Sequence, residues 1–220
     1  MNSYAEENYL KVIYKLSVID KSRVITKSIA DRIGTKPSSV TDMIRKLSEK
    51  KLLNYERYHG VKLTHEGKQI AINIIRKHRL WEEFLSEYLG FKWDEIHEIA
   101  EELEHINSDL LIEKLDRFLK YPKFDPHGDP IPDSEGKFPG TDSILLSELE
   151  PGSACIVTGL VDKSALFLRF LDELEIHIGS ELVILREFNF DLSVEIDVDK
   201  KNKHNISRKI SENILIRRKR

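Results

Sequence analysis

The sequence has 220 residues, enough for one large domain or for two to three small ones. With 40% hydrophobic and 33% charged residues, its composition is that of a folded chain and excludes a disordered one. No apolar run reaches the roughly 18 residues needed to span a bilayer. The first ten residues lack the regions of a signal peptide, and the single Cys155 excludes an internal disulfide framework. We therefore expect a soluble cytoplasmic protein with no membrane partner.

The charges are unevenly distributed along the chain. Residues 1–74 contain 14 Lys and Arg against 8 Asp and Glu, whereas the whole chain has a formal net charge of −3. A basic N-terminal segment on an acidic body predicts that an anionic partner, most simply double-stranded DNA, meets that segment.

Residues 4–51 have the pattern of three helices. Apolar residues recur at helical spacing in 4–16 and again in 27–33, where we expect Thr26 as the N-cap and Gly34 as the end. Pro37 suits the first turn of a third helix that runs to about residue 51. Two helices joined by a tight, Gly-containing turn indicate a helix-turn-helix.

The stretch that follows, "LLNYERYHGVKLTHEGK", predicts two strands around a turn at Gly60 and a new helix from Thr64. A β-hairpin directly behind a recognition helix is a wing, so this order predicts a winged helix-turn-helix DNA-binding domain in residues 1–74.

Three helices are predicted next, at 64–89, 93–106 and 108–120, followed by a loop rich in Pro and Gly. Residues 75–140 are thus a helical domain with a linker. Short β-branched runs, with a helical piece between the first two, then predict a small β-barrel in 141–220, and we expect the basic tail "RRKR" to be mobile. The fold class is mainly α with small β parts.

The second helix of a helix-turn-helix lies in the major groove, with its early residues at the base edges. Its inner face takes Val40, Ile44 and Leu47, so the polar residues between them point outward. A winged helix used for protein contacts is the alternative, but short polar side chains among basic residues favour DNA. The expected DNA-binding residues, including two on the wing, are Lys36, Ser38, Ser39, Thr41, Asp42, Arg45, Lys46, Arg57 and Lys62.

The stretch "HEIAEELEH" (97–105) concentrates carboxylates and imidazoles. At 100° per residue, His97, Glu101, Glu104 and His105 fall within about 100° of one another beside the apolar face, whereas Glu98 and Glu102 face solvent. Glu101 and Glu104 repel each other, and a divalent cation would reverse that effect. Carboxylates with imidazole and without thiolate suit Mn²⁺, Fe²⁺ or Zn²⁺.

The preceding helix contains "RKHRLWEEFL", which places His78 and Glu82 on one face. If the two helices pack antiparallel, these side chains approach His97 or Glu101. The simpler alternative is that the acidic run is merely a solvated helix face.

The chain resembles the diphtheria-toxin-repressor family of metal-dependent regulators over nearly its whole length. The segments "ENYLKVIYKL", "PSSVTDMIRKL", "RKHRLWEEFL", "EELEHINSD" and "DPHGDPIP" carry the resemblance, in family order. It implies a homodimer that binds operator DNA when metal is bound, and a final SH3-like (FeoA-like) domain.

The resemblance also implies two metal sites. The primary site comprises Asn8, Glu101, Glu104 and His105, and the ancillary site comprises His78, Glu82 and His97. Position 101 is typically Cys in the iron-sensing branch and Glu in the manganese-sensing, MntR-like branch, so the resemblance favours Mn²⁺, with Fe²⁺, Zn²⁺ or Co²⁺ as alternatives.

Three positions depart from the family pattern. Asn8 stands where the manganese branch often has Asp, and Lys11 stands where well-known manganese sensors have Glu, so a binuclear site is in doubt. Where the SH3-like domain often contributes a carboxylate to the ancillary site, this chain has Leu166, with Asp162 nearby.

We therefore predict a homodimeric, Mn²⁺-activated transcriptional repressor of metal-uptake genes with no small-molecule substrate and no catalytic residues. The alternatives are an iron- or zinc-sensing repressor of the same architecture, a carboxylate-bridged di-iron enzyme built on Glu102 and His105, and a DNA-binding protein that needs no metal.

Overall fold

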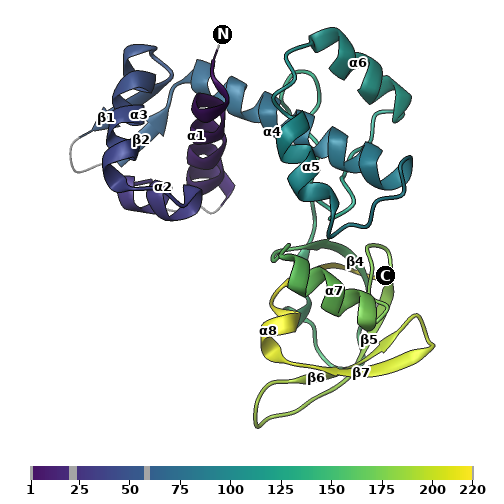
Figure 1. The fold of residues 1–220 in the computed structure, drawn as a ribbon. Helices are drawn as coiled ribbons and strands as arrows, with labels where there is room; N and C mark the ends of the chain where they lie inside the picture. Colours follow the sequence, from purple (N-terminus) through teal and green to yellow (C-terminus); the bar gives the residue numbers. More distant parts are fainter. Residues whose placement is uncertain (1, 20–23, 57–59, 220) are drawn as a thin grey trace. The chain divides into compact units, whose positions relative to one another are not determined.

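The computed structural model describes residues 2–19, 24–56 and 60–219, which form two compact units (Figure 1). The first unit consists of Met1–His78, Glu101–Lys114 and Pro132–Phe138. The second consists of Arg79–Ala100, Leu115–Ile131 and Pro139–Arg220. Among the described residues, no helix combines enough length with enough apolar character to cross a membrane.

The first unit contains the winged helix-turn-helix that the sequence predicts. Its helices are α1 (Tyr4–Tyr14), which continues as a π-helical segment (Lys15–Ile19), α2 (Thr26–Ile33) and α3 (Pro37–Glu49). Strands β1 (Leu53–Glu56) and β2 (Gly60–Leu63) pair antiparallel as the wing. Leu10, Ile13, Ile29, Val40 and Leu47 are among the buried residues of its core, so the apolar spacing identified the inner faces of all three helices.

The expected N-cap at Thr26 is wrong, because Thr26 lies within α2. Ile25 is the N-cap residue, and its backbone N–H donates to Ser28 Oγ at 3.0 Å, so Ser28 supplies the polar group from inside the helix. Gly34 ends α2 in the left-handed conformation, at φ +74°, as the sequence predicts. Gly60, at φ +93°, allows the wing to pass close to the Val24 carbonyl, which accepts from Val61 N–H at 2.9 Å.

Three helices follow the wing: α4 (His65–Glu87), α5 (Ile96–Leu103) and α6 (Asp109–Phe118). Thr64 caps α4, because its Oγ1 accepts from Gly67 N–H at 3.1 Å. Helix α5 is shorter than the predicted 93–106. It ends at Leu103, so Glu104 and His105 lie in the turn after the helix, where Ile106 N–H bonds back to Leu103 O.

The second unit includes an antiparallel sheet in the order β3-β8-β4-β5-β6-β7. Its strands are β3 (Ile144–Leu145), β4 (Ala154–Leu160), β5 (Glu181–Glu187), β6 (Val194–Val198), β7 (Asn202–Ile206) and β8 (Ile214–Arg218). Helices α7 (Ala165–Glu173) and α8 (Arg208–Ser211) accompany it. Irregular register in β4 and β5 is typical of a sheet that bends to enclose its own core.

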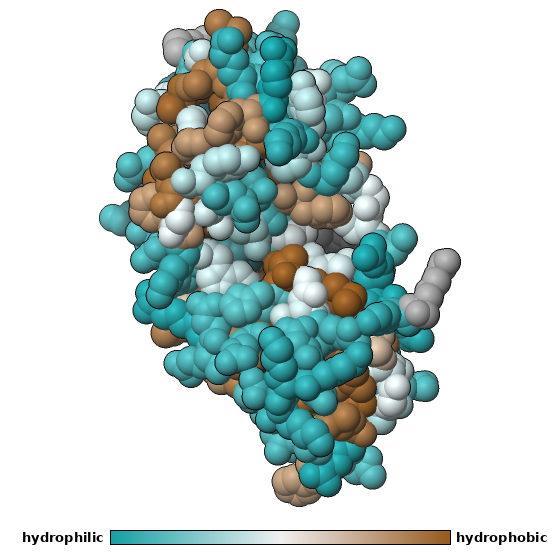
Figure 2. All heavy atoms as spheres, turned by 90° about the vertical axis from the view of Figure 1, so that its right-hand side faces the viewer, coloured by the Kyte–Doolittle hydropathy of each residue, from teal (hydrophilic) through white to brown (hydrophobic). Residues whose placement is uncertain are grey.

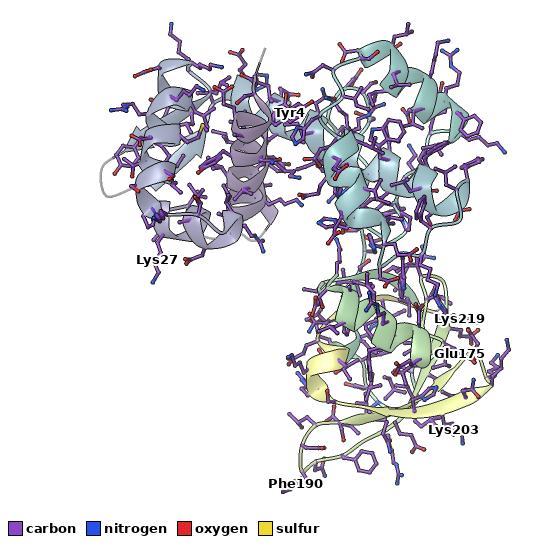
Figure 3. All side chains as sticks on the ribbon, in the orientation of Figure 1. Tyr4, Lys27, Glu175, Phe190, Lys203 and Lys219 are labelled. Atoms are coloured by element: carbon purple, nitrogen blue, oxygen red, sulfur yellow. The ribbon has the colours of Figure 1, made fainter. Side chains whose placement is uncertain are left out.

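The expectation of a mobile basic tail is wrong for the residues that the structure describes. Arg217 and Arg218 belong to β8 and pair with Ile156 and Cys155, and Lys219 Nζ donates to Glu181 Oε2 at 2.6 Å. Figure 3 shows Phe190 in the turn between β5 and β6, where its side chain points into solvent.

Candidate metal centres and DNA-binding surface

Helix α3 presents a polar face to solvent. The predicted contact residues that the structure describes are all exposed: Lys36, Ser38, Ser39, Thr41, Asp42, Arg45, Lys46 and Lys62. Arg57 lies outside the described residues. Because Val40, Ile44 and Leu47 are buried on the opposite side, the helix is oriented to offer short polar side chains to a partner.

Two of the exposed cations already have carboxylate partners. Arg45 forms an ion pair with Asp42 at 3.2 Å, and Lys46 Nζ lies 3.3 Å from Glu6 Oε1 on α1. Lys50 reaches the same Glu6 oxygen at 2.8 Å. Glu6 therefore joins α1 to α3, the second helix of the helix-turn-helix.

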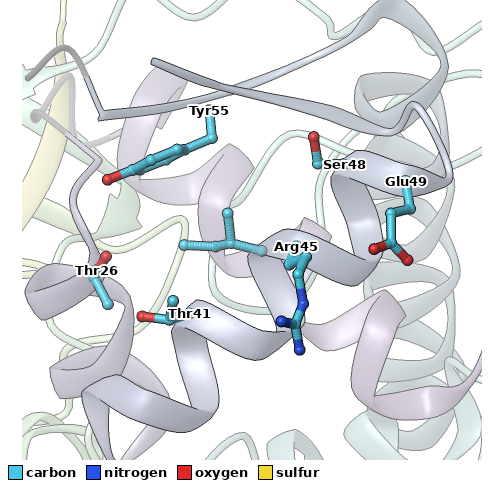
Figure 4. Close-up of a pocket in the computed structure, with 7 residues that line it drawn as sticks. Thr26, Thr41, Arg45, Ser48, Glu49 and Tyr55 are labelled. Carbon is cyan, nitrogen blue, oxygen red and sulfur yellow. The ribbon is translucent and has the colours of Figure 1, made fainter. Parts of the chain in front are cut away.

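A cavity of about 440 Å³ opens beside α3 (Figure 4). Thr41 and Arg45 line it from α3, and Thr26 and Tyr55 line it from α2 and β1. The sequence did not single out Thr26 or Tyr55 as contact residues, because they reach this face only through the fold of three separate elements.

A first cluster of ionisable residues joins α1, α4 and the end of α5. Lys11 Nζ lies 2.9 Å from Glu101 Oε1 and 2.5 Å from Glu104 Oε1. The second oxygen of Glu104, Oε2, lies 2.7 Å from His78 Nδ1. Glu104 is completely buried, whereas the Glu101 side chain is 44% exposed. The sequence assigned His78 to the other site, and here it contacts a residue of the primary one.

His105 belongs to the same cluster through α1. Its Nδ1 lies 2.6 Å from Glu7 Oε2, and its ring stacks on Tyr4 with a centroid separation of 4.7 Å. Both Glu7 and His105 are buried. Glu7 directly precedes Asn8 on α1 but was not predicted as a site residue, because its burial is evident only in the folded chain.

Asn8 bears on whether this cluster suits a metal. Its Oδ1 is buried and has no hydrogen-bond partner within the part of the chain that the structure describes. A buried polar oxygen without a partner is costly unless something else engages it. A divalent cation is a suitable group, since carboxylates, amide oxygens and imidazoles together are the donors that Mn²⁺ accepts.

The charge state of Glu104 also fits a cation site. Burial alone would raise the pKa of Glu104, but the hydrogen bond with His78 and the positive charge of Lys11 outweigh it and hold the pKa below 4.5. The carboxylate is therefore ionised at neutral pH.

A second cluster lies entirely in the second unit. Glu82, Asp125 and His127 are all buried. Each offers one potential ligand atom, and these three atoms lie within 4.8 Å of one another. His97 Nδ1 lies 3.2 Å from Glu82 Oε1, which places together the two members of the predicted ancillary site that belong to this unit. The sequence analysis quoted "DPHGDPIP" only as a family signature and did not recognise Asp125 and His127 as candidate ligands.

The loop that carries Asp125 and His127 is rigidly held. Asp125 Oδ1 accepts from the backbone N–H groups of His127 and Asp129, both at 2.9 Å, and His127 Nε2 lies 2.8 Å from the Trp93 carbonyl. Burial and the neighbouring Asp129 and Glu82 raise the pKa of Asp125 to about 7. Burial would lower the pKa of His127, but Glu82 and Asp125 reverse this and raise it.

The SH3-like domain contributes a cation to this region. Lys163 forms an ion pair with Asp129, and Arg79 pairs with the same carboxylate at 3.0 Å. Leu166, the position matched to the family's carboxylate, is 80% exposed. Asp162 Oδ1 accepts from Ser164 N–H at 2.8 Å and so helps to begin α7.

Three family models and several known proteins match this chain. The model of the iron dependent repressor N-terminal DNA binding domain matches residues 2–61, and that of the iron dependent repressor metal binding and dimerisation domain matches residues 64–133. The FeoA domain model matches residues 144–218. The HTH-type transcriptional regulator MntR of Oceanobacillus iheyensis is 36% identical over 119 residues, which cover 54% of this chain and 80% of that protein. The chain belongs to the diphtheria-toxin-repressor family.

Other members of this family are similar over more of the chain. The iron-dependent repressor IdeR of Mycobacterium tuberculosis is 32% identical over 158 residues, covering 69% of this chain and 68% of that protein. A solved manganese-dependent transcriptional repressor in complex with manganese is 33% identical, with a TM-score of 0.88 over 97% of this chain and 99% of that one. The chain is accordingly a metal-dependent, DNA-binding transcriptional repressor of metal homeostasis, and the di-iron enzyme is excluded.

Proposed function

We propose that the activating metal is Mn²⁺ and that the regulated genes encode metal uptake. The observation that carries this proposal is the donor set of the first cluster, which offers oxygen and imidazole nitrogen without thiolate: Glu7, His78, Glu101, Glu104 and His105. The buried Oδ1 of Asn8, the residue after Glu7 on α1, is a further oxygen donor. Such donors favour Mn²⁺ over softer ions. The one cysteine, Cys155, is buried in the sheet of the second unit.

Glu101, Glu104, His105 and Asn8 are proposed as the primary site, with Glu7 and His78 close enough to join them. Glu82, Asp125, His127 and His97 are proposed as the ancillary site. When bound, the metal supplies positive charge that neutralises the carboxylates brought together from α1 and α5.

The residues of α1 then transmit the effect to DNA. Glu7 holds α1 to the turn after α5 through His105, and Glu6 holds the same helix to Lys46 and Lys50. Fixing α1 therefore fixes α3, the proposed recognition helix. The cation selects this arrangement only to the extent that it binds it more tightly than other arrangements.

The family's metal binding and dimerisation domain implies a homodimer. We propose that its surface includes the aromatic side chains of the second unit around Phe84. Tyr88 and Phe118 pack together with a centroid separation of 4.7 Å, yet are 47% and 53% exposed. Hydrophobic side chains form patches on the surface shown in Figure 2. Apolar patches of this kind are typical of protein interfaces.

We also propose the domain division 1–74, 75–140 and 141–220. The order of the three matched family models supports it, although their limits of 2–61, 64–133 and 144–218 differ by several residues.

The proposed metal is tested by measuring operator affinity while Mn²⁺, Fe²⁺, Zn²⁺ and Co²⁺ are titrated separately, using duplexes selected from a random pool. We expect Mn²⁺ to activate operator binding at a free concentration that is found in cells. Activation by Fe²⁺ or Zn²⁺ with no response to Mn²⁺ would support the alternative sensor of the same architecture. A solved relative, ScaR, 31% identical, has been crystallised with bound Zn²⁺.

A further inference from the structure

Lys11 occupies an unusual place for a lysine. Only 4% of the residue is exposed, and its ammonium contacts two carboxylates that lie about ninety positions further along the chain, Glu101 and Glu104. A buried ammonium is tolerated only where carboxylates compensate its lost hydration. Helix α1 therefore places the Lys11 ammonium within the first cluster.

The oxygens that Lys11 contacts are the ones that a metal would need. Glu104 Oε1 and Glu101 Oε1 both accept from Lys11 Nζ, and Glu104 Oε2 already faces His78 Nδ1. A divalent cation that coordinates Glu101 and Glu104 through these oxygens must take them from the ammonium. Full engagement of the same Glu104 oxygen by both cations is disfavoured, because like charges at contact distance repel.

We propose that Lys11 is a built-in competitor of the activating metal and sets the metal concentration at which the repressor responds. This inference rests on the proposed metal function of the first cluster. Metal binding is then an exchange, in which the ammonium leaves Glu101 and Glu104 as the divalent cation arrives. Glu101, with 44% of its side chain exposed, provides the path for both.

The exchange explains why a lysine is compatible with a metal-sensing site. Lys11 holds Glu101 and Glu104 close together and balances part of their charge, so the ligands are assembled in advance. The cation must displace that ion pair, which lowers its apparent affinity and raises the response threshold.

The test compares Mn²⁺ binding to the full chain, wild type and Lys11→Met, by competition with a fluorescent chelator. We expect K11M to bind Mn²⁺ more tightly by roughly tenfold or more, because no ammonium competes for the two carboxylates. Lys27→Met is the control: it removes an exposed lysine of α2 and should leave Mn²⁺ affinity unchanged.

Unchanged or weaker Mn²⁺ binding by K11M would overturn the proposal. Absence of Mn²⁺ binding by the wild type would instead overturn the proposed metal function, so the two failures are distinguishable.

A measurement on the wild type covers the case in which K11M does not fold. Acetylation of Lys11 by an amine-reactive ester, followed by peptide mass spectrometry, should accelerate several-fold when Mn²⁺ is added, because the ammonium is released. The rate at Lys27 should not change. Equal protection of Lys11 with and without Mn²⁺ would contradict the exchange.

Discussion

The two clusters contain similar side chains but are attached to different parts of the molecule. In the first, Glu104 and His105 contact residues of α1, which in turn is paired with α3 through Glu6. In the second, His127 contacts the Trp93 carbonyl, Asp125 accepts from backbone N–H groups and Glu82 pairs with His97, all within the second unit, which contains no part of the winged helix.

This difference assigns different roles to similar chemistry. A cation held in the first cluster would act on α1 and, through Glu6, on α3, the proposed recognition helix, whereas a cation held in the second would stabilise the elements around it. Basic side chains accompany both clusters. Lys11 contacts the first cluster directly, and Arg79 and Lys163 pair with Asp129 beside the second. We expect the first cluster to control activation and the second to modulate it.

The largest effect is expected from Glu104→Gln, which should abolish activation by Mn²⁺. The carboxylate lies at the centre of the first cluster, and allosteric coupling of this kind typically changes affinity by about 5–150-fold. Operator affinity measured with Mn²⁺ and with chelator should become equal in this variant. The exposed Glu98 on α5 provides the control, Glu98→Gln, which should respond to Mn²⁺ like the wild type. A full response in E104Q would remove the first cluster from the mechanism.

Glutamine is chosen at this position because truncation would confound the result. Glu104 is completely buried between Lys11 and His78, so Glu104→Ala would remove a buried carboxylate that contacts both and would cost stability as well as metal binding.

Arg45→Ala should weaken operator binding with or without Mn²⁺, because Arg45 is proposed to contact DNA and takes no part in metal binding. Removal of one phosphate contact should lower the dependence of log affinity on log salt by about 1. Lys203 on β7 is exposed in the SH3-like domain, and Lys203→Ala serves as the control. An unchanged salt slope in R45A would mean that Arg45, which is paired with Asp42, does not contact the DNA backbone.

His127→Ala tests the second cluster and should have a smaller effect on DNA. We expect the bound Mn²⁺ per chain and the Mn²⁺-induced rise in Tm to fall, while the Mn²⁺-dependent gain in operator affinity changes by less than about fivefold. Loss of activation as complete as that in E104Q would make the two clusters equivalent and would refute the division of roles.

Glu6→Gln tests the ion pairs that join α1 to α3. The test is the pH dependence of the free energy of unfolding. Burial would raise the pKa of Glu6, but Lys50, the Ser3 backbone and Lys46 lower it to about 2, from an ordinary value of 4.5. Because the folded-state pKa is depressed, Glu6 stabilises the fold above about pH 4.5, and this stabilisation is lost as pH falls towards 2.

The Glu6→Gln variant should therefore be less stable than the wild type near pH 7 by about 1–3 kcal/mol in urea unfolding, and the difference should shrink below pH 4.5. A difference that stays constant between pH 7 and pH 3 would show that the charge of Glu6 does not stabilise the fold.

Local patterns predicted the winged helix well, because its helices have apolar faces and end at Gly34 or begin at Pro37. The same logic placed Glu98 and Glu102 at the surface, but His97, which it grouped with Glu101, Glu104 and His105, is exposed as well. Helical periodicity could not predict that α5 ends at Leu103, since the turn that follows is set by contacts with α1.

Contacts between positions that are distant in the sequence could not be predicted, for a physical reason. The pairing of Lys11 with Glu101 spans 90 positions, and no local spacing encodes it. Asp125 and His127 lie in an irregular loop without periodicity, so only the folded chain brings them to Glu82. Similarly, β8 carries the basic residues that suggest a free tail, and its place in the sheet follows from pairing with β4.

The most direct test of the central claim is the affinity of the wild-type protein for a selected operator, measured at one ionic strength with saturating Mn²⁺ and with a chelator. If metal bound to the first cluster fixes the DNA-binding helices, affinity should be about 5–150-fold higher with Mn²⁺. Equal affinity under the two conditions would contradict the account.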